Sequence, residues 1–271
     1  GLIPVLMLGF YLLYLGKSRI LRRAAGSDAN ADSSPTGQRR SALAGKAVWI
    51  IAFLCFAATG YSWTENHLLS LDRDQWVSLY ADGGLVYARP AVALRFAMWL
   101  VSTVPLMALG VAWQLARGAG SDREAMAGPV RRLAVLALGG LLASAILGVA
   151  YASVLPASDR ALLTTPFGFL AIIAAGLMVQ AAVWIRLWRA PQLSRGALLI
   201  ASAAAVLAVI ATALVREHLR LGTLADDALL AVHARAVETG GMIAFVVFLL
   251  LNTGIMVSFM RSVSRELKKT T

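Results

Sequence analysis

Residues 133–155 read LAVLALGGLLASAILGVAYASVL, a run without a single charged side chain. A run of this length and polarity predicts a transmembrane helix, because about 20 helical residues cross the hydrocarbon core of a bilayer. The run has to be helical, since an open strand would leave backbone N–H and C=O groups without hydrogen bonds in lipid. Six other apolar runs occur along the chain, and only those at 92–116 and 166–188 contain a charged residue.

These seven runs predict an all-α, polytopic membrane protein with seven transmembrane helices. The composition agrees, because 59% of the residues are hydrophobic and only 14% are charged, whereas soluble domains carry about 25% charged residues. The length of 271 residues leaves no room for a separate soluble domain beside seven spans. The predicted spans are 1–16, 47–64, 92–116, 133–155, 166–188, 197–215 and 240–260.

Lysine and arginine predict the orientation of these spans. Most of them lie in residues 17–46, 117–132, 186–196 and 261–271, which all fall on one side of the predicted topology. Basic loops stay in the cytoplasm, so we expect a periplasmic N-terminus and a cytoplasmic C-terminus. The Ala-, Arg- and Leu-rich composition is typical of high-GC bacteria, which predicts a bacterial inner membrane. The net charge of +11 therefore reflects topology and does not indicate nucleic-acid binding.

The predicted spans divide the chain into three parts. The first is a peripheral transmembrane helix, 1–16, and the second is a flexible, basic cytoplasmic linker, 17–46. The third is a six-helix transmembrane bundle, 47–271. Two segments of the opposite side, 65–91 and 224–238, carry apolar residues at helical spacing, which predicts two short amphipathic helices on the outer surface.

All three histidines fall at or near the predicted outer face, and they are His67, His218 and His233. Neutral imidazole is a good haem or metal ligand. We predict that His67 and His218 form the first candidate pair of ligands to the iron of a b-type haem, with His233 as the spare ligand. The alternative is that these imidazoles hydrogen-bond to loops and lipid headgroups.

Charged residues also gather at this face. Arg95 lies about one turn inside its predicted helix, and ionisable groups near hydrocarbon are usually paired, so Glu65 and Glu238 are its candidate partners. One interpretation is a quinone or haem-propionate site, with arginine as donor and glutamate as proton acceptor. The other is an interfacial salt bridge or a snorkelling arginine.

Two features of the spans bear on the function and the packing of the chain. Polar side chains in the middle of the spans are uncharged, whereas a proton or ion pump needs a buried relay. Small residues at spacing four, Gly140, Ser144, Gly148 and Ala152, predict close contact with another helix of this chain or of a partner subunit.

The sequence contains no phosphate loop, nucleophile elbow, metalloprotease or dinucleotide-binding motif. We therefore expect a non-pumping subunit of an electron-transfer complex that binds quinone, a b-type haem or both near the periplasmic face. Its partners would be membrane lipids and other membrane or periplasmic subunits. The alternatives are a haem-free structural or assembly subunit and, less favoured for lack of internal repeats, a transporter of an uncharged solute.

Overall fold

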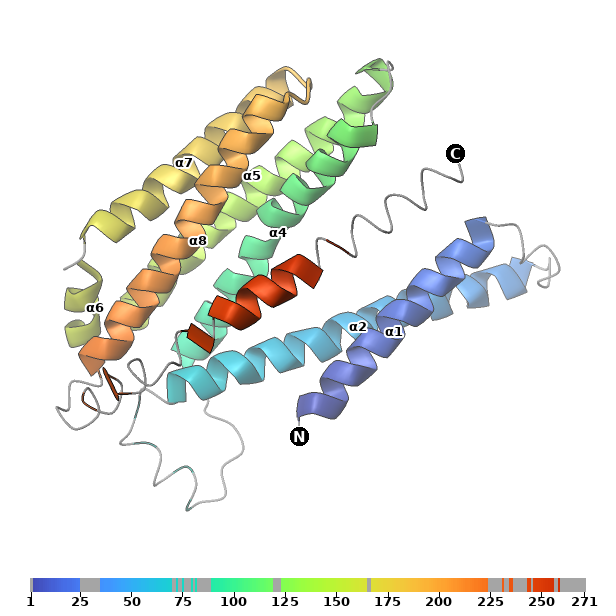
Figure 1. The fold of residues 1–271 in the computed structure, drawn as a ribbon. Coiled ribbons are helices and arrows are strands. Elements are labelled where there is room, and N and C mark those ends of the chain that lie inside the picture. The colour runs from blue at the N-terminus through green and yellow to red at the C-terminus, as the bar shows by residue number, and fades with distance from the viewer. Residues whose placement is uncertain are drawn as a thin grey trace. The chain divides into compact units, whose positions relative to one another are not determined.

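A computed structural model describes most of the chain, and its described residues form helices and no strand. They belong to two compact units, Gly1–Arg216 and Glu217–Thr271. The residues outside the description are 1, 25–34, 70–71, 73–74, 76–78, 80, 82–88, 119–122, 165–166, 224–230, 232–233, 236–242, 245, 256–257 and 259–271. The helices are α1 (Leu2–Ala24), α2 (Pro35–Leu69), α4 (Pro90–Gly118), α5 (Arg123–Val154), α6 (Ala157–Thr164), α7 (Phe167–Arg189) and α8 (Arg195–Thr223) (Figure 1).

Among the described residues, five helices are long and apolar enough to cross a membrane, which is compatible with the predicted polytopic membrane protein. Two shorter apolar helices, Leu2–Ser18 and Val246–Ile255, coincide with the first and last predicted spans. The second of them rises only about 15 Å, half of a hydrocarbon core, so seven spans stay a prediction. The five long segments are Gly45–Leu69, Pro90–Arg117, Met126–Val154, Gly168–Arg189 and Arg195–Gly222.

The surfaces of these helices carry large apolar side chains. Met107, Val149 and Met178 are each more than 60% exposed, on α4, α5 and α7 respectively. A soluble monomer rarely exposes extended apolar patches, whereas lipid solvates them without cost. The described helices therefore have the surface that a membrane protein needs.

Within the predicted linker 17–46, the described residues 17–24 and 35–46 are helical. Helix α1 continues past its apolar run to Ala24, and α2 begins at Pro35. Lysine, arginine and leucine are good helix formers, so the helix continues into residues that are too polar to lie in hydrocarbon. Proline suits the first position of a helix because its missing N–H has no partner there anyway.

Most residues of the predicted surface helices, in 65–91 and 224–238, lie outside the described part.

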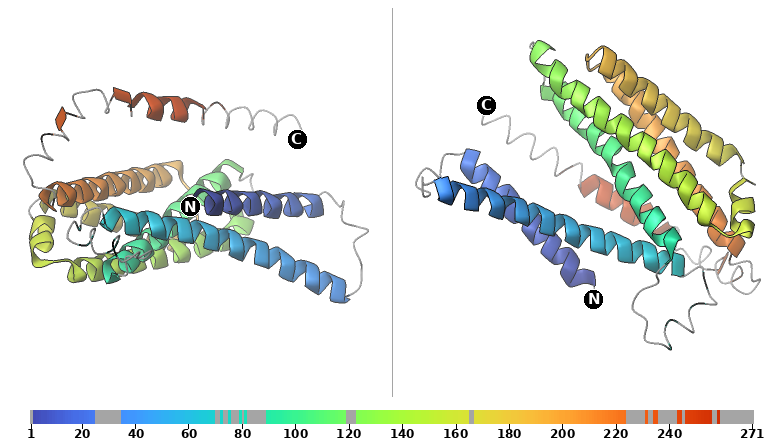
Figure 2. Two further views of the ribbon diagram at one scale, coloured as in Figure 1. Left: turned by 90° about the horizontal axis from the view of Figure 1, so that it is seen from below. Right: turned by 180° about the vertical axis from the view of Figure 1, so that it is seen from behind.

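Helices α4 and α5 run antiparallel, side by side, in Figures 1 and 2. The small residues of α5 face α4 at close range. The Oγ atoms of Ser102 and Ser144 lie 3.1 Å apart. A Cβ atom on Gly140 would lie only 2.8 Å from Cδ of Pro105. The small-residue face predicted from the sequence is thus used inside the chain, against α4.

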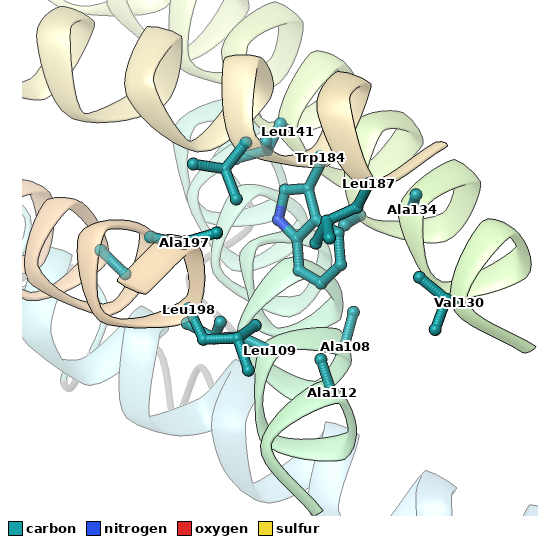
Figure 3. Packing of buried hydrophobic residues seen from close by; sticks show 14 residues of the cluster. Ala108, Leu109, Ala112, Val130, Ala134, Leu141, Trp184, Leu187, Ala197 and Leu198 are labelled. Atoms are coloured by element: carbon teal, nitrogen blue, oxygen red, sulfur yellow. The ribbon is translucent and has the colours of Figure 1, made fainter. Parts of the chain in front are cut away.

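Helices α7 and α8 complete a four-helix bundle with α4 and α5. Trp184 of α7 is 1% exposed, and its indole points into the space between the other three helices (Figure 3). Trp113 Nε1 of α4 donates a hydrogen bond of 3.0 Å to Ser202 Oγ of α8. The buried core contains Ala108, Leu109, Ala112, Val130, Ala134, Ala137, Leu141, Val183, Trp184, Leu187, Ala197, Leu198, Ala201 and Ala205.

Helices α1 and α2 form an additional pair. The rings of Phe10 and Phe56 meet edge to face, with centroids 5.1 Å apart, and the neighbouring Cys55 is buried as a free thiol. Helix α2 reaches α4 through a second edge-to-face pair, Tyr61 and Phe96, with centroids 5.6 Å apart. The predicted peripheral helix therefore packs on α2.

Two neighbouring glycines test the α4–α5 contact. We expect Gly140→Ala to lower the free energy of unfolding by about 1–3 kcal/mol, because the new methyl group overpacks the interface. Gly139→Ala is the matched control, since no atom beyond its own turn of helix lies within 4 Å of the position that its Cβ would take. Its effect should stay within about 1 kcal/mol. Titration with a denaturing detergent measures both, and equal losses in the two variants would contradict the contact.

Candidate functional site

The candidate site lies at the end of the four-helix bundle where α4 begins and α5 ends, called the Arg95 end below. Helix α2 also reaches this end, where a Cβ on Gly60 would lie 3.1 Å from the ring of Phe96. Thr64 of α2 and Val92 of α4 are fully buried here. Helices α2 and α5 therefore pack against the first turns of α4, although these turns stand at the end of the bundle.

The α4–α5 register brings Arg95 to Tyr151. Between the Ser102–Ser144 pair and the Arg95 end, Met98 of α4 lies opposite Gly148 of α5. The Sδ atom of Met98 lies 3.6 Å from the position that a Cβ atom on Gly148 would take. One turn further on each helix come Arg95 and Tyr151. Arg95 is only 6% exposed at this position, so it does not reach water in the way that a snorkelling arginine does.

Two aromatic rings hold the Arg95 guanidinium. Its Cζ atom lies 5.8 Å from the ring centroid of Tyr151 and 5.6 Å from that of Trp99, both within the range of cation–π attraction. Nη1 donates a hydrogen bond to the Tyr151 hydroxyl at 3.4 Å, which is long and therefore weak. A guanidinium has five N–H donors, so most of its hydrogen-bonding capacity is unused by the described residues.

The described residues give Arg95 no carboxylate partner. Glu65, one of the two predicted partners, lies partly buried in α2, and the hydrogen bond of Arg95 goes to Tyr151 instead. Glu238, the other predicted partner, lies outside the described part. The exposed Arg216 of α8 adds a second positive charge that acts on Arg95. Arg216 therefore does not neutralise the charge of Arg95.

The two described histidines belong to different helices. His67 lies in the last turn of α2 with a buried Nε2 atom. His218 lies in α8, and its Nε2 atom is also buried, without a hydrogen-bond partner among the described residues. These two residues belong to different compact units, and His233 lies outside the described part. The pairing of His67 with His218 thus stays a prediction.

No group of three or more His, Cys, Asp or Glu side chains within the described residues is placed to hold a metal ion. The two histidines that would hold a haem iron are a smaller set than such a group. The chemistry that this geometry offers at the Arg95 end is binding of an oxygen atom with negative charge. A buried cation with unused N–H donors suits a carboxylate, a phosphate or a quinone oxygen.

Sequence reasoning did not single out Tyr151 and Trp99. Trp99 lies one helical turn from Arg95, a spacing at which side chains are neighbours. Tyr151 follows Gly148 of the small-residue face by one turn. Its position opposite Arg95 was predictable once that face had been assigned to α4, but spacing alone does not say which helix a small-residue face meets.

Comparison of this chain with protein-family models, with curated proteins and with solved structures finds no match.

The contact geometry predicts which part of Tyr151 holds Arg95. We expect Tyr151→Phe to change the free energy of unfolding by less than about 1 kcal/mol, because the lost hydrogen bond is long. Tyr151→Leu should cost about 1–2 kcal/mol more, because it removes the ring beneath a desolvated cation.

A double-mutant cycle provides the control for this prediction. In an Arg95→Met background the difference between Tyr151→Phe and Tyr151→Leu should shrink, since the cation is gone. The same difference in both backgrounds would mean that the ring contributes only packing.

Proposed function

We propose that this chain is a non-pumping, multi-pass subunit of an electron-transfer complex in a bacterial inner membrane, and that it binds a b-type haem, a quinone or both near the periplasmic face. The observation that carries the proposal is the burial of an imidazole nitrogen in each described histidine. A buried nitrogen without a partner, as in His218, costs free energy. Coordination of a haem iron would satisfy it.

The proposed ligands are His67 and His218, one from the end of α2 and one from the end of α8. Each supplies its Nε2 atom, and His233 is the substitute if one of them is not a ligand. The haem, when bound, supplies one-electron chemistry. The protein contributes the imidazoles, which fix the iron, and the apolar helices, which exclude water from it.

The distribution of buried polar groups supports electron transfer without proton pumping. The buried polar side chains among the described residues are Thr64, Arg95 and Gln180, and none of them is a carboxylate. A proton pathway through a membrane normally uses ionisable relay groups such as carboxylates. Electrons need no such chain of groups.

We also propose seven spans, with a periplasmic N-terminus and a cytoplasmic C-terminus. The helix directions support this orientation, because the basic residues of the bundle cluster at the end opposite to Arg95. The end opposite to Arg95 carries Arg117 of α4, Arg131 and Arg132 of α5, Arg186 and Arg189 of α7 and Arg195 of α8. The Arg95 end then faces the periplasm.

The main alternative, a haem-free structural or assembly subunit, loses one of its supports. Its small-residue face was a candidate surface for a partner subunit, but α4 of the same chain occupies much of that face. Transport of an uncharged solute has no specific observation in its favour.

An absorbance spectrum of the dithionite-reduced complex tests the proposal. We expect the α band of a b-type haem in the wild type and a loss of about tenfold or more in His67→Ala and in His218→Ala, since each removes one axial ligand. Arg160→Met, at an exposed position, is the control and should keep the full band. A complex without haem, or an unchanged band in both histidine variants and in His233→Ala, would contradict histidine ligation by this chain.

A further inference from the structure

Arg95 is a buried cation whose charge the described residues do not neutralise. It is 6% exposed, its one hydrogen bond goes to a neutral phenol, and the other charge acting on it, Arg216, is also positive. Ionisable groups within a bilayer are normally paired, because desolvation of an isolated charge is costly. The site therefore calls for an anion from outside the described residues.

We propose that Arg95 binds the phosphodiester group of a membrane phospholipid. The guanidinium fork matches two oxygen atoms of a phosphate, and the rings of Trp99 and Tyr151 leave most of its N–H donors free for them. The nearby positive charge of Arg216 favours the same ligand. This inference is independent of the proposed haem or quinone.

The depth of Arg95 fits a headgroup. It lies five residues after Pro90, the first residue of α4, which corresponds to about 8 Å along a helix. The headgroup region on each side of a bilayer is about 5–8 Å deep. A phosphate at this level needs no distortion of the membrane to reach the guanidinium.

Apolar surface for the acyl chains adjoins the cation. Trp99, whose ring centroid lies 5.6 Å from the guanidinium carbon, is itself 37% exposed and so offers apolar surface beside the cation. Val149 and Val154 on the neighbouring α5 are exposed as well. An amphipathic anion with two hydrocarbon chains uses both the charge and this surface, whereas a free phosphate ion uses only the charge.

Native mass spectrometry of the protein in a phosphate-free maltoside detergent tests this assignment. We expect one phospholipid to remain bound to the wild type and the bound fraction to fall about tenfold or more in Arg95→Met, which removes the charge but keeps an apolar chain of similar length. Arg95→Lys should retain an intermediate fraction, because an ammonium keeps the charge without the fork. Arg160→Met, which removes an exposed arginine, is the matched control and should retain the lipid.

A second measurement keeps the assignment testable if Arg95→Met changes the yield of folded protein. Adding phosphatidylglycerol to the detergent-solubilised protein should raise the Tm of the wild type and of Arg160→Met but not that of Arg95→Met.

Three outcomes would overturn the phospholipid assignment. Equal lipid retention in the wild type and in Arg95→Met would mean that Arg95 does not hold the phosphate. Equal stabilisation of the wild type by inorganic phosphate would identify the ligand as a free anion. A loss of haem from Arg95→Met with unchanged lipid content would assign the arginine to a haem propionate, whereas failure of the haem proposal alone would leave lipid retention unaffected.

Discussion

The close approach of α4 and α5 is the contact on which the first compact unit depends. Lipid offers no hydrophobic driving force for helix association, so membrane helices hold together by packing and interhelical hydrogen bonds. Gly140 lets Pro105 reach the backbone of α5, and Ser102 meets Ser144 one turn away. Both helices then contribute one wall of the core that Trp184 fills, which positions α7 and α8.

The same register creates the least expected feature of the molecule. Continued by two turns from the serine pair, it places Arg95 against Tyr151 inside the bundle end. The cation is held by aromatic rings, which attract it but do not neutralise it. A buried charge of this kind lowers the free energy of unfolding. Ionisable groups in membranes are therefore candidates for functional sites. The geometry thus links helix packing to the proposed phospholipid site at Arg95.

Sequence patterns predicted much of the fold because a helix that crosses lipid needs a long apolar run, which is visible in the sequence. Apolar length located the five long helices, and the spacing of Gly140, Ser144 and Gly148 predicted a close helix contact. Polarity was a poor guide to helix ends, since α1 continues to Ala24 through basic residues that are good helix formers. Tyr151 was missed because helix pairing depends on tertiary packing. The histidine pairing still rests on the sequence alone.

Cross-linking across α4 and α5 tests the central claim most directly. In a Cys55→Ala background, Ser102→Cys with Ser144→Cys replaces the two oxygen atoms that lie 3.1 Å apart, a geometry close enough for a disulfide. Mild oxidation in native membranes should remove both thiols from labelling. Thr103→Cys with Ser144→Cys, whose first position is exposed on α4, should stay reduced. Equal oxidation of the two pairs, or none in either, would contradict the register that places Arg95 beside Tyr151.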